Sequence, residues 1–309
     1  MIYGFAAFTV TFVFFHSTNN FSILNKTNES YLCPYFEGGL GNHMFIYASL
    51  YGIARDKHMT LLLNSHDEIN TIFQLNVTKL RSTKNICSKS FIIQERLPCT
   101  YDSEILNFDR KKVVKLKGFL QSWKYFIKYE DEIRKQFVFE RLIQDQAQEI
   151  IDSHINKYKS ENDSHRHFTI VGVHIRRGDY LRPDNKELGY NVAPMSYIEK
   201  AFTLFRNKFT HCVFLVFTSP NKNDKKWLKK NVNGPDIIKI GTNKRDVDMC
   251  ALSQCNHTII TVGTFGWWAA WLSNGTTVYY KNVAVQNSKL RQYFSEDMLD
   301  FFPSQWIGL

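Results

Sequence analysis

Apolar runs of strand length alternate with helix-like runs along this chain, and that alternation limits the folds open to it. Residues 168–175, 212–219 and 257–262 are short runs rich in β-branched and aromatic residues, as buried strands are. Residues 195–209, between the first two runs, carry apolar positions at helical spacing. Strands that alternate with helices form parallel sheets whose faces are covered by helices. The pattern therefore predicts an α/β protein.

The alternation falls into two halves. A strand-like run at 31–36 leads through a glycine-rich loop into a helical stretch, and the polar segment 159–167 separates this half from the second. Two such halves indicate two Rossmann-like domains that face a cleft, with ligands at the carboxyl ends of the strands. We expect an N-terminal domain at 31–160 and a C-terminal domain at 161–309, preceded by a separate segment, 1–30.

The motif HIRRGDY, residues 174–180, begins at the end of the strand 168–175. Its adjacent arginines, Arg176 and Arg177, should point in different directions, so one can reach the cleft while the other supports the loop. A guanidinium fork matches a phosphate or a carboxylate. Asp179 can pair with either arginine, so a structural ion pair explains the motif as well as a ligand site does.

The motif GGLGNHMF, residues 38–45, joins a predicted strand to a predicted helix. Glycines at such a turn let a ligand approach the backbone, and the helix N-terminus that follows favours an anion. Gly41 and Asn42 are candidates to contact that anion, and Asn42 is also a plausible helix cap. The sequence of this turn lacks the full GxGxxG fingerprint, which disfavours an NAD-dependent enzyme.

A third turn, TVGTFGWW at 261–268, again leads from a strand into a helix. The Thr264 hydroxyl and neighbouring backbone N–H groups, including that of Phe265, can bind a second phosphate oxygen. The tryptophans in and after this turn are expected to fill the core and the contact between domains rather than to stack on a sugar. They are Trp267, Trp268 and Trp271.

Asp246 and Asp248 have the DxD spacing of some metal sites. They open a predicted helix, where aspartate is common as a cap and favours the helix dipole, and we prefer this structural role. If a ligand's base or ribose is bound here, Asp248 is the candidate.

The chain carries 39 basic and 29 acidic residues, a net charge of +10. The basic residues are scattered, and the sequence has no long Lys/Arg block, zinc-finger spacing or RNP-type motif. Nucleic acid is therefore the weakest explanation of the charge, compared with an anionic membrane surface or a phosphorylated small molecule.

Six cysteines occur without a CxxC pair. An even number suits disulfides in an oxidising compartment, but the pairing cannot be deduced from the sequence. Cys87 and Cys99 can close a short loop, and Cys250 and Cys255 are close enough to be bridged or simply packed.

The segment 2–15 is almost entirely apolar but shorter than the roughly 17–25 residues of a membrane span. A cleaved signal, a short signal-anchor and a truncated gene product all fit it. Seven N-x-S/T sequons follow, and Asn256 begins a predicted buried strand, so we expect no glycan there but expect glycans at five of the others. These five are Asn25, Asn28, Asn76, Asn162 and Asn274. Together these features favour a luminal protein with an N-terminal anchor.

The motifs together resemble the galactoside alpha-1,2-fucosyltransferases, glycosyltransferase family 11. The resemblance is carried by GGLGNHMF, HIRRGDY and CNHTIITVGTFGWWAAWL at 255–272, and the closing FPSQWIGL is similar to the family's C-terminal end. The motifs keep the family's order and spacing over residues 38–309. His43 departs from the pattern, because glutamine is usual there.

The resemblance implies a GT-B-type fold with the acceptor on the N-terminal side and GDP-fucose mainly in the C-terminal domain, without a metal or other cofactor. It implies inverting transfer of L-fucose to the 2-hydroxyl of a galactose residue on a glycan. Arg176 and Asp179 are the expected catalytic residues, with Arg176 on the β-phosphate and Asp179 as its brace or as a general base. The expected donor-binding residues are His174, Arg176, Arg177, Gly41, Asn42, Asp248, Thr264 and Phe265.

The resemblance also implies a single-pass type II Golgi membrane protein with a luminal catalytic domain. Three alternatives stay open. A fucosyltransferase of another linkage shares the arginine pair but should lack the segment 255–272. A catalytically silent Golgi sugar-binding protein would bind sugar without releasing GDP. A metal-dependent transferase would use Asp246 and Asp248.

Overall fold

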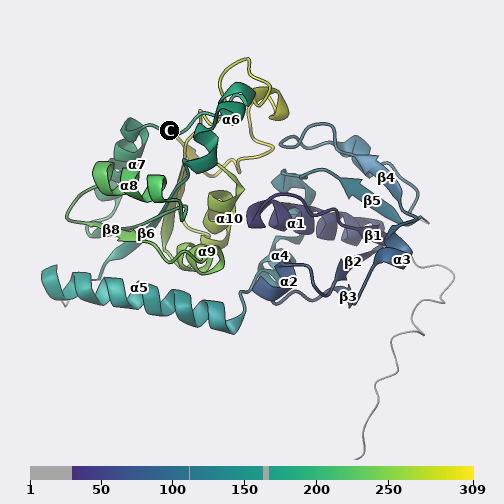
Figure 1. Ribbon diagram of the computed structural model, residues 1–309, viewed down its shortest axis with the longest axis horizontal. Helices are drawn as coiled ribbons and strands as arrows, with labels where there is room; N and C mark the ends of the chain where they lie inside the picture. The colour runs from purple at the N-terminus through teal and green to yellow at the C-terminus, as the bar shows by residue number, and fades with distance from the viewer. Residues whose placement is uncertain (1–29, 111, 163–166) are drawn as a thin grey trace, which may run out of the picture.

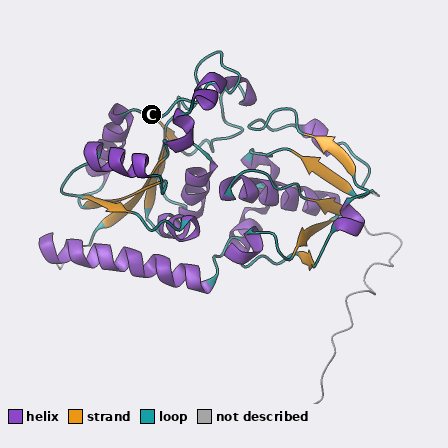
Figure 2. Cartoon of the chain, viewed as in Figure 1, coloured by secondary structure: helices purple, strands orange, loops and turns teal. Residues whose placement is uncertain are grey.

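The computed structural model describes residues 30–110, 112–162 and 167–309. The expected N-terminal anchor, and with it the sequons at Asn25 and Asn28, lies outside these residues. Figure 1 shows two α/β halves side by side, and Figure 2 shows helices around the strands of each half. Among the described residues, no helix combines the length and the apolarity that a bilayer span requires.

The first half is built on a parallel sheet with the strand order β3-β2-β1-β5-β4. Its strands are β1 (Tyr31–Cys33), β2 (Thr60–Asn64), β3 (Thr78–Leu80), β4 (Phe91–Gln94) and β5 (Val114–Lys117). The glycine-rich turn after β1 leads into a long helix that crosses the sheet. The helices are α1 (Leu40–Lys57), α2 (Ile69–Ile72), α3 (Lys84–Cys87) and α4 (Glu130–Gln136), with 3-10 turns η2 (Ser103–Leu106), η3 (Trp123–Tyr125) and η4 (Ile127–Tyr129).

The second half is built on a parallel sheet with the order β11-β10-β9-β6-β7-β8. Its strands are β6 (Thr169–Ile175), β7 (Cys212–Thr218), β8 (Ile237–Ile240), β9 (His257–Ile260), β10 (Thr277–Tyr279) and β11 (Ile307–Gly308). Every residue of β7 is buried, as expected for a strand covered on both faces. Counted from β6, this order is that of a Rossmann fold, so the predicted α/β class and parallel sheets are confirmed.

Helices follow the strands of the second half as the apolar spacing predicts. They are α6 (Pro183–Leu188), α7 (Met195–Lys208), α8 (Lys222–Asn231), α9 (Arg245–Ser253) and α10 (Thr264–Ser273), with 3-10 turns η5 (Gly178–Leu181) and η6 (Arg291–Tyr293). The apolar faces of α7, α8, α9 and α10 join the same continuous core as the first half.

Helix α5 (Arg141–Asn162) belongs by its packing to the second half. Its buried residues form one stripe at helical spacing, Ile143, Ala147, Ile151 and Ile155. The helix packs against α9 and lies along the second half in Figure 1. Helix α5 therefore packs on the second half, although the domain boundary expected at the polar segment 159–167 follows it in the chain.

An aromatic cluster joins the two halves. Trp267 and Trp268 of α10 are completely buried, and their rings lie 4.5 and 5.0 Å from that of Phe45 on α1. Phe126 stacks on Trp268 at 5.5 Å, and Phe301 from the C-terminal segment stacks on Phe45 at 5.9 Å. The prediction that the tryptophans pack the core and the domain contact is confirmed, since Trp271 is buried as well.

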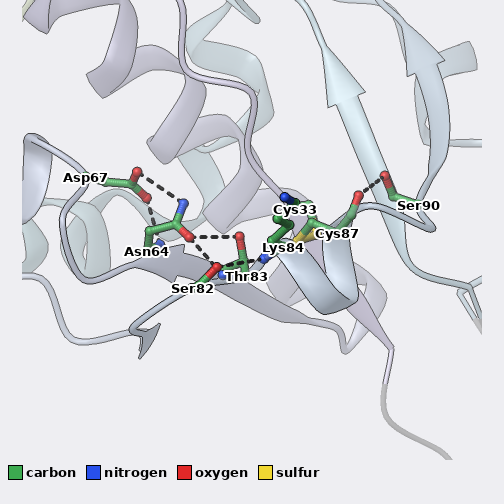
Figure 3. The surroundings of a disulfide bond; sticks show 8 residues. All are labelled: Cys33, Asn64, Asp67, Ser82, Thr83, Lys84, Cys87 and Ser90. Carbon is green, nitrogen blue, oxygen red and sulfur yellow. Dashed lines mark hydrogen bonds between the residues drawn. A yellow bond between two sulfur atoms is a disulfide. The ribbon is translucent and has the colours of Figure 1, made fainter.

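A disulfide joins Cys33, at the end of β1, to Cys87 in α3 (Figure 3). Cys99 is free and buried, so the proposed loop between Cys87 and Cys99 is wrong. Cys250 and Cys255 are also free and buried, so this pair is packed and not bridged. The sequence could not give the pairing because the partners lie 54 residues apart and meet only when the sheet forms.

Candidate functional site

A large hollow lies where the strand order of the second sheet reverses. Strands β6 and β9 are neighbours there, although the chain leaves them in opposite lateral directions. Ligands of open α/β sheets bind at this position, outside the carboxyl ends of the strands. A cleft of about 720 Å³ opens at those ends, and residues from both halves line it. We call it the large cleft.

Three helices begin at the large cleft. Its lining includes Gly39 and Leu40 at the start of α1, Lys244 and Arg245 at the start of α9, and Gly263 and Thr264 at the start of α10. The first N–H groups of a helix lack partners within the helix and carry about half a positive charge. Three such ends that converge on one cleft make a site for an anion with several oxygens.

Arg176 lies in the large cleft and pairs with Asp179. Its Nε lies 3.0 Å from the Asp179 Oδ1, and a terminal nitrogen lies 2.7 Å from the same oxygen. The backbone N–H of Arg176 donates to the Thr261 hydroxyl at 2.9 Å, which ties the end of β6 to β9. Arg176 can therefore form this ion pair with Asp179 and still bind a ligand, because both residues line the large cleft and the Arg176 side chain is one-third exposed.

Arg177 points away from the large cleft. Its guanidinium lies 4.0 Å from the ring centre of Trp227, on α8. Its buried Nε has no hydrogen-bond partner among the described residues, and burial lowers the pKa of the guanidinium. The adjacent arginines thus diverge as expected, but only Arg176 lines the large cleft, so Arg177 has a supporting position.

Asp224, in the first turn of α8, holds the arginine loop and was not anticipated from the sequence. Its carboxylate is 3% exposed and accepts from the Gly178 backbone N–H at 2.9 and 3.0 Å. The Ser219 hydroxyl donates to the same carboxylate. Nothing in the helix sequence distinguishes Asp224 from a residue that favours the helix dipole, so only the fold reveals its role.

His174 is buried in the wall of the large cleft. Its ring lies 4.9 Å from the Phe265 ring, and burial lowers its pKa to about 3. The imidazole is therefore neutral at physiological pH. Its Nδ1 is buried and has no hydrogen-bond partner among the described residues. His174 can offer a hydrogen bond at the site but contributes no charge.

Asn42 joins the two halves at the floor of the large cleft. Its Oδ1 accepts from the Thr264 hydroxyl at 2.8 Å and from Gln121 Nε2 at 3.1 Å. Gly39 is the N-cap of α1, so the cap role considered for Asn42 is wrong. A side chain on Gly41 would meet the Thr264 backbone at 2.6 Å, so glycine is required for α1 and α10 to meet.

Asp246 and Asp248 line the large cleft in the first turn of α9. The N-cap is Lys244, so the capping role preferred from the sequence is wrong, although the acids still favour the helix dipole. Asp248 accepts from the Thr242 hydroxyl at 2.6 Å, and burial raises its pKa to about 6. Within the described residues, no three acidic, histidine or cysteine side chains gather as metal ligands would.

The sequons in the described residues lie on exposed asparagines. Asn76, Asn162 and Asn274 are exposed, and Asn274 Oδ1 accepts from Arg134. Asn256 is exposed too, contrary to the expectation of a buried strand start. Its Oδ1 nevertheless accepts from the Ile170 N–H at 2.9 Å, which holds the side chain against β6.

The structure thus brings the predicted site residues, Arg177 excepted, to one cleft. Those that line it are His174, Arg176, Asp179, Gly41, Asn42, Asp248, Thr264 and Phe265. They come from four segments of both halves, each at or near the carboxyl end of a strand.

Comparison with protein families places this arrangement among known proteins. The model of the family described as "Glycosyl transferase family 11" matches residues 9–309. Galactoside alpha-(1,2)-fucosyltransferase 2 of Rattus norvegicus is 30% identical over 282 residues, which cover 88% of this chain and 75% of the relative. Galactoside alpha-(1,2)-fucosyltransferase 1 of Homo sapiens is 29% identical over 282 residues, which cover 89% and 74%.

Solved structures share the architecture at low identity. NodZ alpha-1,6-fucosyltransferase, crystallised with GDP, superposes with a TM-score of 0.53 and 13% identity over 82% of this chain and 96% of that one. A variant of Arabidopsis thaliana FUT1 in complex with GDP gives a TM-score of 0.50 and 14% identity over 84% and 73%. These likenesses confirm the expected GT-B-type fold of two facing Rossmann-like domains.

Proposed function

The chain belongs to glycosyl transferase family 11, and from this we propose that it transfers L-fucose from GDP-fucose to the 2-hydroxyl of a galactose residue on a glycan, with inversion. It is a glycosyltransferase, and the galactoside alpha-(1,2)-fucosyltransferases match it over most of its length. GDP is the nucleotide bound by the structural neighbours named above.

One observation carries the donor assignment. Three helix N-termini and Arg176 converge at the strand-order reversal of the second sheet. A pyrophosphate offers several anionic oxygens to such an array, whereas a neutral sugar offers none. GDP-fucose bound there has its nucleotide over the carboxyl ends of β6 and β9.

Arg176 stabilises the leaving group. The bond between fucose C1 and the β-phosphate oxygen breaks while the acceptor hydroxyl attacks C1 from the opposite face and releases its proton to solvent, and negative charge develops on GDP. A fixed donor aimed at developing charge is worth roughly 2.7–4 kcal/mol of transition-state stabilisation. Asp179 holds the guanidinium in place. Because its carboxylate already accepts from Arg176, we assign Asp179 to orientation rather than to proton removal.

Asp248 and His174 serve the rest of the donor. Asp248 is largely buried at the start of α9 with its pKa raised to about 6, so it can accept or donate toward the base or ribose. The neutral imidazole of His174 lies behind Phe265 and keeps one nitrogen free of protein partners among the described residues. Arg176 and the helix ends neutralise the pyrophosphate in this account, so we propose that no metal is required.

We also propose a luminal, Golgi-membrane location with a type II topology. The apolar segment 2–15 would serve as the signal-anchor. The Cys33–Cys87 disulfide supports an oxidising compartment, since such bonds are rare in the cytosol. Exposed sequons at Asn76 and Asn274 support access to the glycosylation machinery.

The test is transfer from GDP-fucose to a galactose-terminated acceptor with EDTA present. We expect a product that an α-1,2-specific fucosidase cleaves, at a rate that EDTA does not change. A product resistant to that fucosidase would indicate another linkage. GDP-fucose binding without transfer to any galactoside would favour a silent sugar-binding protein, and loss of activity with EDTA would favour a metal-dependent enzyme.

A further inference from the structure

A second hollow of about 330 Å³ lies next to the large cleft. We call it the small cavity. Its walls come from both halves and from the C-terminal segment, which returns across the first half and is held there by bonds such as that from Trp123 Nε1 to the Leu299 carbonyl at 2.9 Å. The two hollows share part of one wall. The residues that line both are Asn42, Tyr180, Val262, Gly263 and Thr264.

Three tyrosines face the small cavity with their hydroxyls unengaged. The rings of Tyr180 and Tyr190 are 4.4 Å apart, and Tyr293 belongs to the C-terminal segment. Within the described part of the chain, none of these hydroxyls makes a hydrogen bond. All three side chains are half-buried, so their hydroxyls are open to a ligand with hydroxyl groups of its own.

A buried amide adds to the polar part of the wall. Gln121 is 9% exposed, donates to Asn42, and accepts from the Cys99 thiol at 3.4 Å. Asn42, Thr261 and Thr264 add further neutral polar groups, the rest of the lining is mostly aliphatic and aromatic, and no charged side chain of the described residues takes part. The small cavity therefore suits a neutral ligand with an apolar face and a few hydroxyls, and it does not suit the pyrophosphate.

We propose that the small cavity binds the terminal galactose of the acceptor, with Tyr190 and Tyr293 as binding residues and Tyr180 at the junction with the donor. The assignment rests on the proposed function. A galactose ring offers an apolar face of C–H groups to an aromatic ring and hydroxyls to phenols and amides. A cavity of this volume lies at the lower end of small-molecule sites, which fits one terminal sugar rather than a long chain.

The shared wall gives the transfer its geometry. Reacting atoms must come within about 3–3.5 Å, so donor and acceptor have to meet across a common boundary. Tyr180 lies on that boundary, with the Arg176 guanidinium 5.6 Å from its ring on one side and Tyr190 on the other. Gly263 keeps the boundary thin, because a side chain there would meet the Tyr180 hydroxyl at 2.8 Å.

The test compares acceptor and donor constants in matched tyrosine variants of the full chain, with methyl β-D-galactoside as acceptor. Tyr190→Phe and Tyr293→Phe keep the ring and remove the hydroxyl, and each should raise the acceptor KM about 2- to 10-fold. Tyr293→Ala should raise it roughly tenfold or more, because the ring is lost as well. Its backbone carbonyl still accepts from the Cys99 N–H, so the fold around it is retained. The Kd for GDP should stay within about twofold in all three variants.

Tyr158→Phe, on α5 and away from both hollows, is the control and should leave both constants unchanged. An unchanged acceptor KM in the three cavity variants overturns the assignment, and so does a GDP Kd that rises as much as the KM. A wild-type protein that binds GDP-fucose but never fucosylates the galactoside would instead refute the proposed function, and the acceptor assignment with it. Normal wild-type transfer with insensitive variants refutes only the assignment.

Discussion

The large cleft and the small cavity lie back to back, yet they are built in different ways. The large cleft is lined by charged side chains and helix N-termini, and most of its wall comes from four short continuous segments at strand ends. The small cavity is lined by neutral side chains scattered along the chain from Asn42 to Phe302. An anion can be held largely by backbone at the edge of a sheet, whereas a neutral sugar needs side chains that only tertiary packing gathers.

The largest expected effect comes from removing the Cys33–Cys87 disulfide, which lies outside both hollows. The disulfide closes a loop of 54 residues, and replacing Cys33 and Cys87 with alanine should cost about 4 kcal/mol of unfolding free energy. Neither cysteine lines a hollow, so the GDP Kd and the acceptor KM of the folded double variant should match wild type. Denaturant unfolding and initial-rate kinetics measure the two quantities. A changed acceptor KM would contradict this expectation, because it would mean that the loss of the disulfide alters the small cavity.

Arg176→Ala tests the large cleft, which is lined by charged side chains. We expect kcat to fall about 10²- to 10³-fold, because a fixed donor to the leaving group is removed. The acceptor KM and the melting temperature should change little, since the side chain is one-third exposed and, among the described residues, Asp179 is its only ion-pair partner.

The matched control is Arg182→Ala. This arginine lies in the same loop, pairs with the exposed Asp184 and does not line the large cleft. Full activity in Arg176→Ala, or an equal loss in both variants, would contradict the assignment of the leaving-group cation.

Gly41→Ala tests the wall that separates the hollows. The new methyl group would meet backbone and side-chain atoms of Thr264 at 2.6–2.7 Å, so the unfolding free energy should fall by about 1–3 kcal/mol and both substrate constants should worsen. A methyl group added at Gly39 would meet nothing within 4 Å, so Gly39→Ala should leave the unfolding free energy nearly unchanged. The comparison of the two alanines separates the close contact from the general cost of changing a glycine. Equal stabilities would mean that the wall can relax.

Glu95 tests the small cavity, whose lining is neutral, and a substitution there has the smallest expected effect. Its Oε2 accepts from the Phe119 and Leu120 N–H groups in the loop that carries Phe119 to the small cavity. Burial raises the pKa of Glu95 from 4.5 to about 8. The folded state thus binds a proton that the unfolded state releases, so the stabilising contribution is complete below about pH 4.5 and is lost as pH rises toward 8.

Glu95→Gln should therefore flatten this pH dependence. We expect it to be about 1 kcal/mol more stable than wild type near the upper end of that range, since it keeps the acceptor but never ionises, and an amide left partly unpartnered offsets much of the gain. Melting temperatures measured at acidic and at mildly alkaline pH give the result. A wild-type protein whose stability is flat over this range would contradict a buried neutral Glu95.

The residues of the large cleft could be predicted from the sequence because each motif is continuous and follows a strand. Parallel strands bring their carboxyl ends to one edge, so the motifs had to meet there. The direction of Arg177 could not be predicted, because it depends on Trp227 in a helix that begins 45 residues later. Asp224 was missed for the same reason.

Other features were missed because they depend on contacts between the halves. Asn42 has the position of a cap by its sequence, but Thr264 and Gln121 bind its carbonyl once the halves meet. Helix α5 follows the first half in the chain yet packs on the second, because its apolar stripe matches α9. The small cavity was missed because Tyr180 is the only one of its three tyrosines in a motif, and nothing in the sequence places Tyr190 and Tyr293 beside it.

The most direct test of the account is hydrogen–deuterium exchange of the whole protein with and without GDP, in the presence of EDTA. We expect protection at the segments of the large cleft, 38–42, 174–180, 243–248 and 262–266, and unchanged exchange at 290–294 beside the small cavity. Protection confined to the segments of the small cavity, or the absence of protection by saturating GDP, would contradict the central claim that the large cleft holds the donor nucleotide.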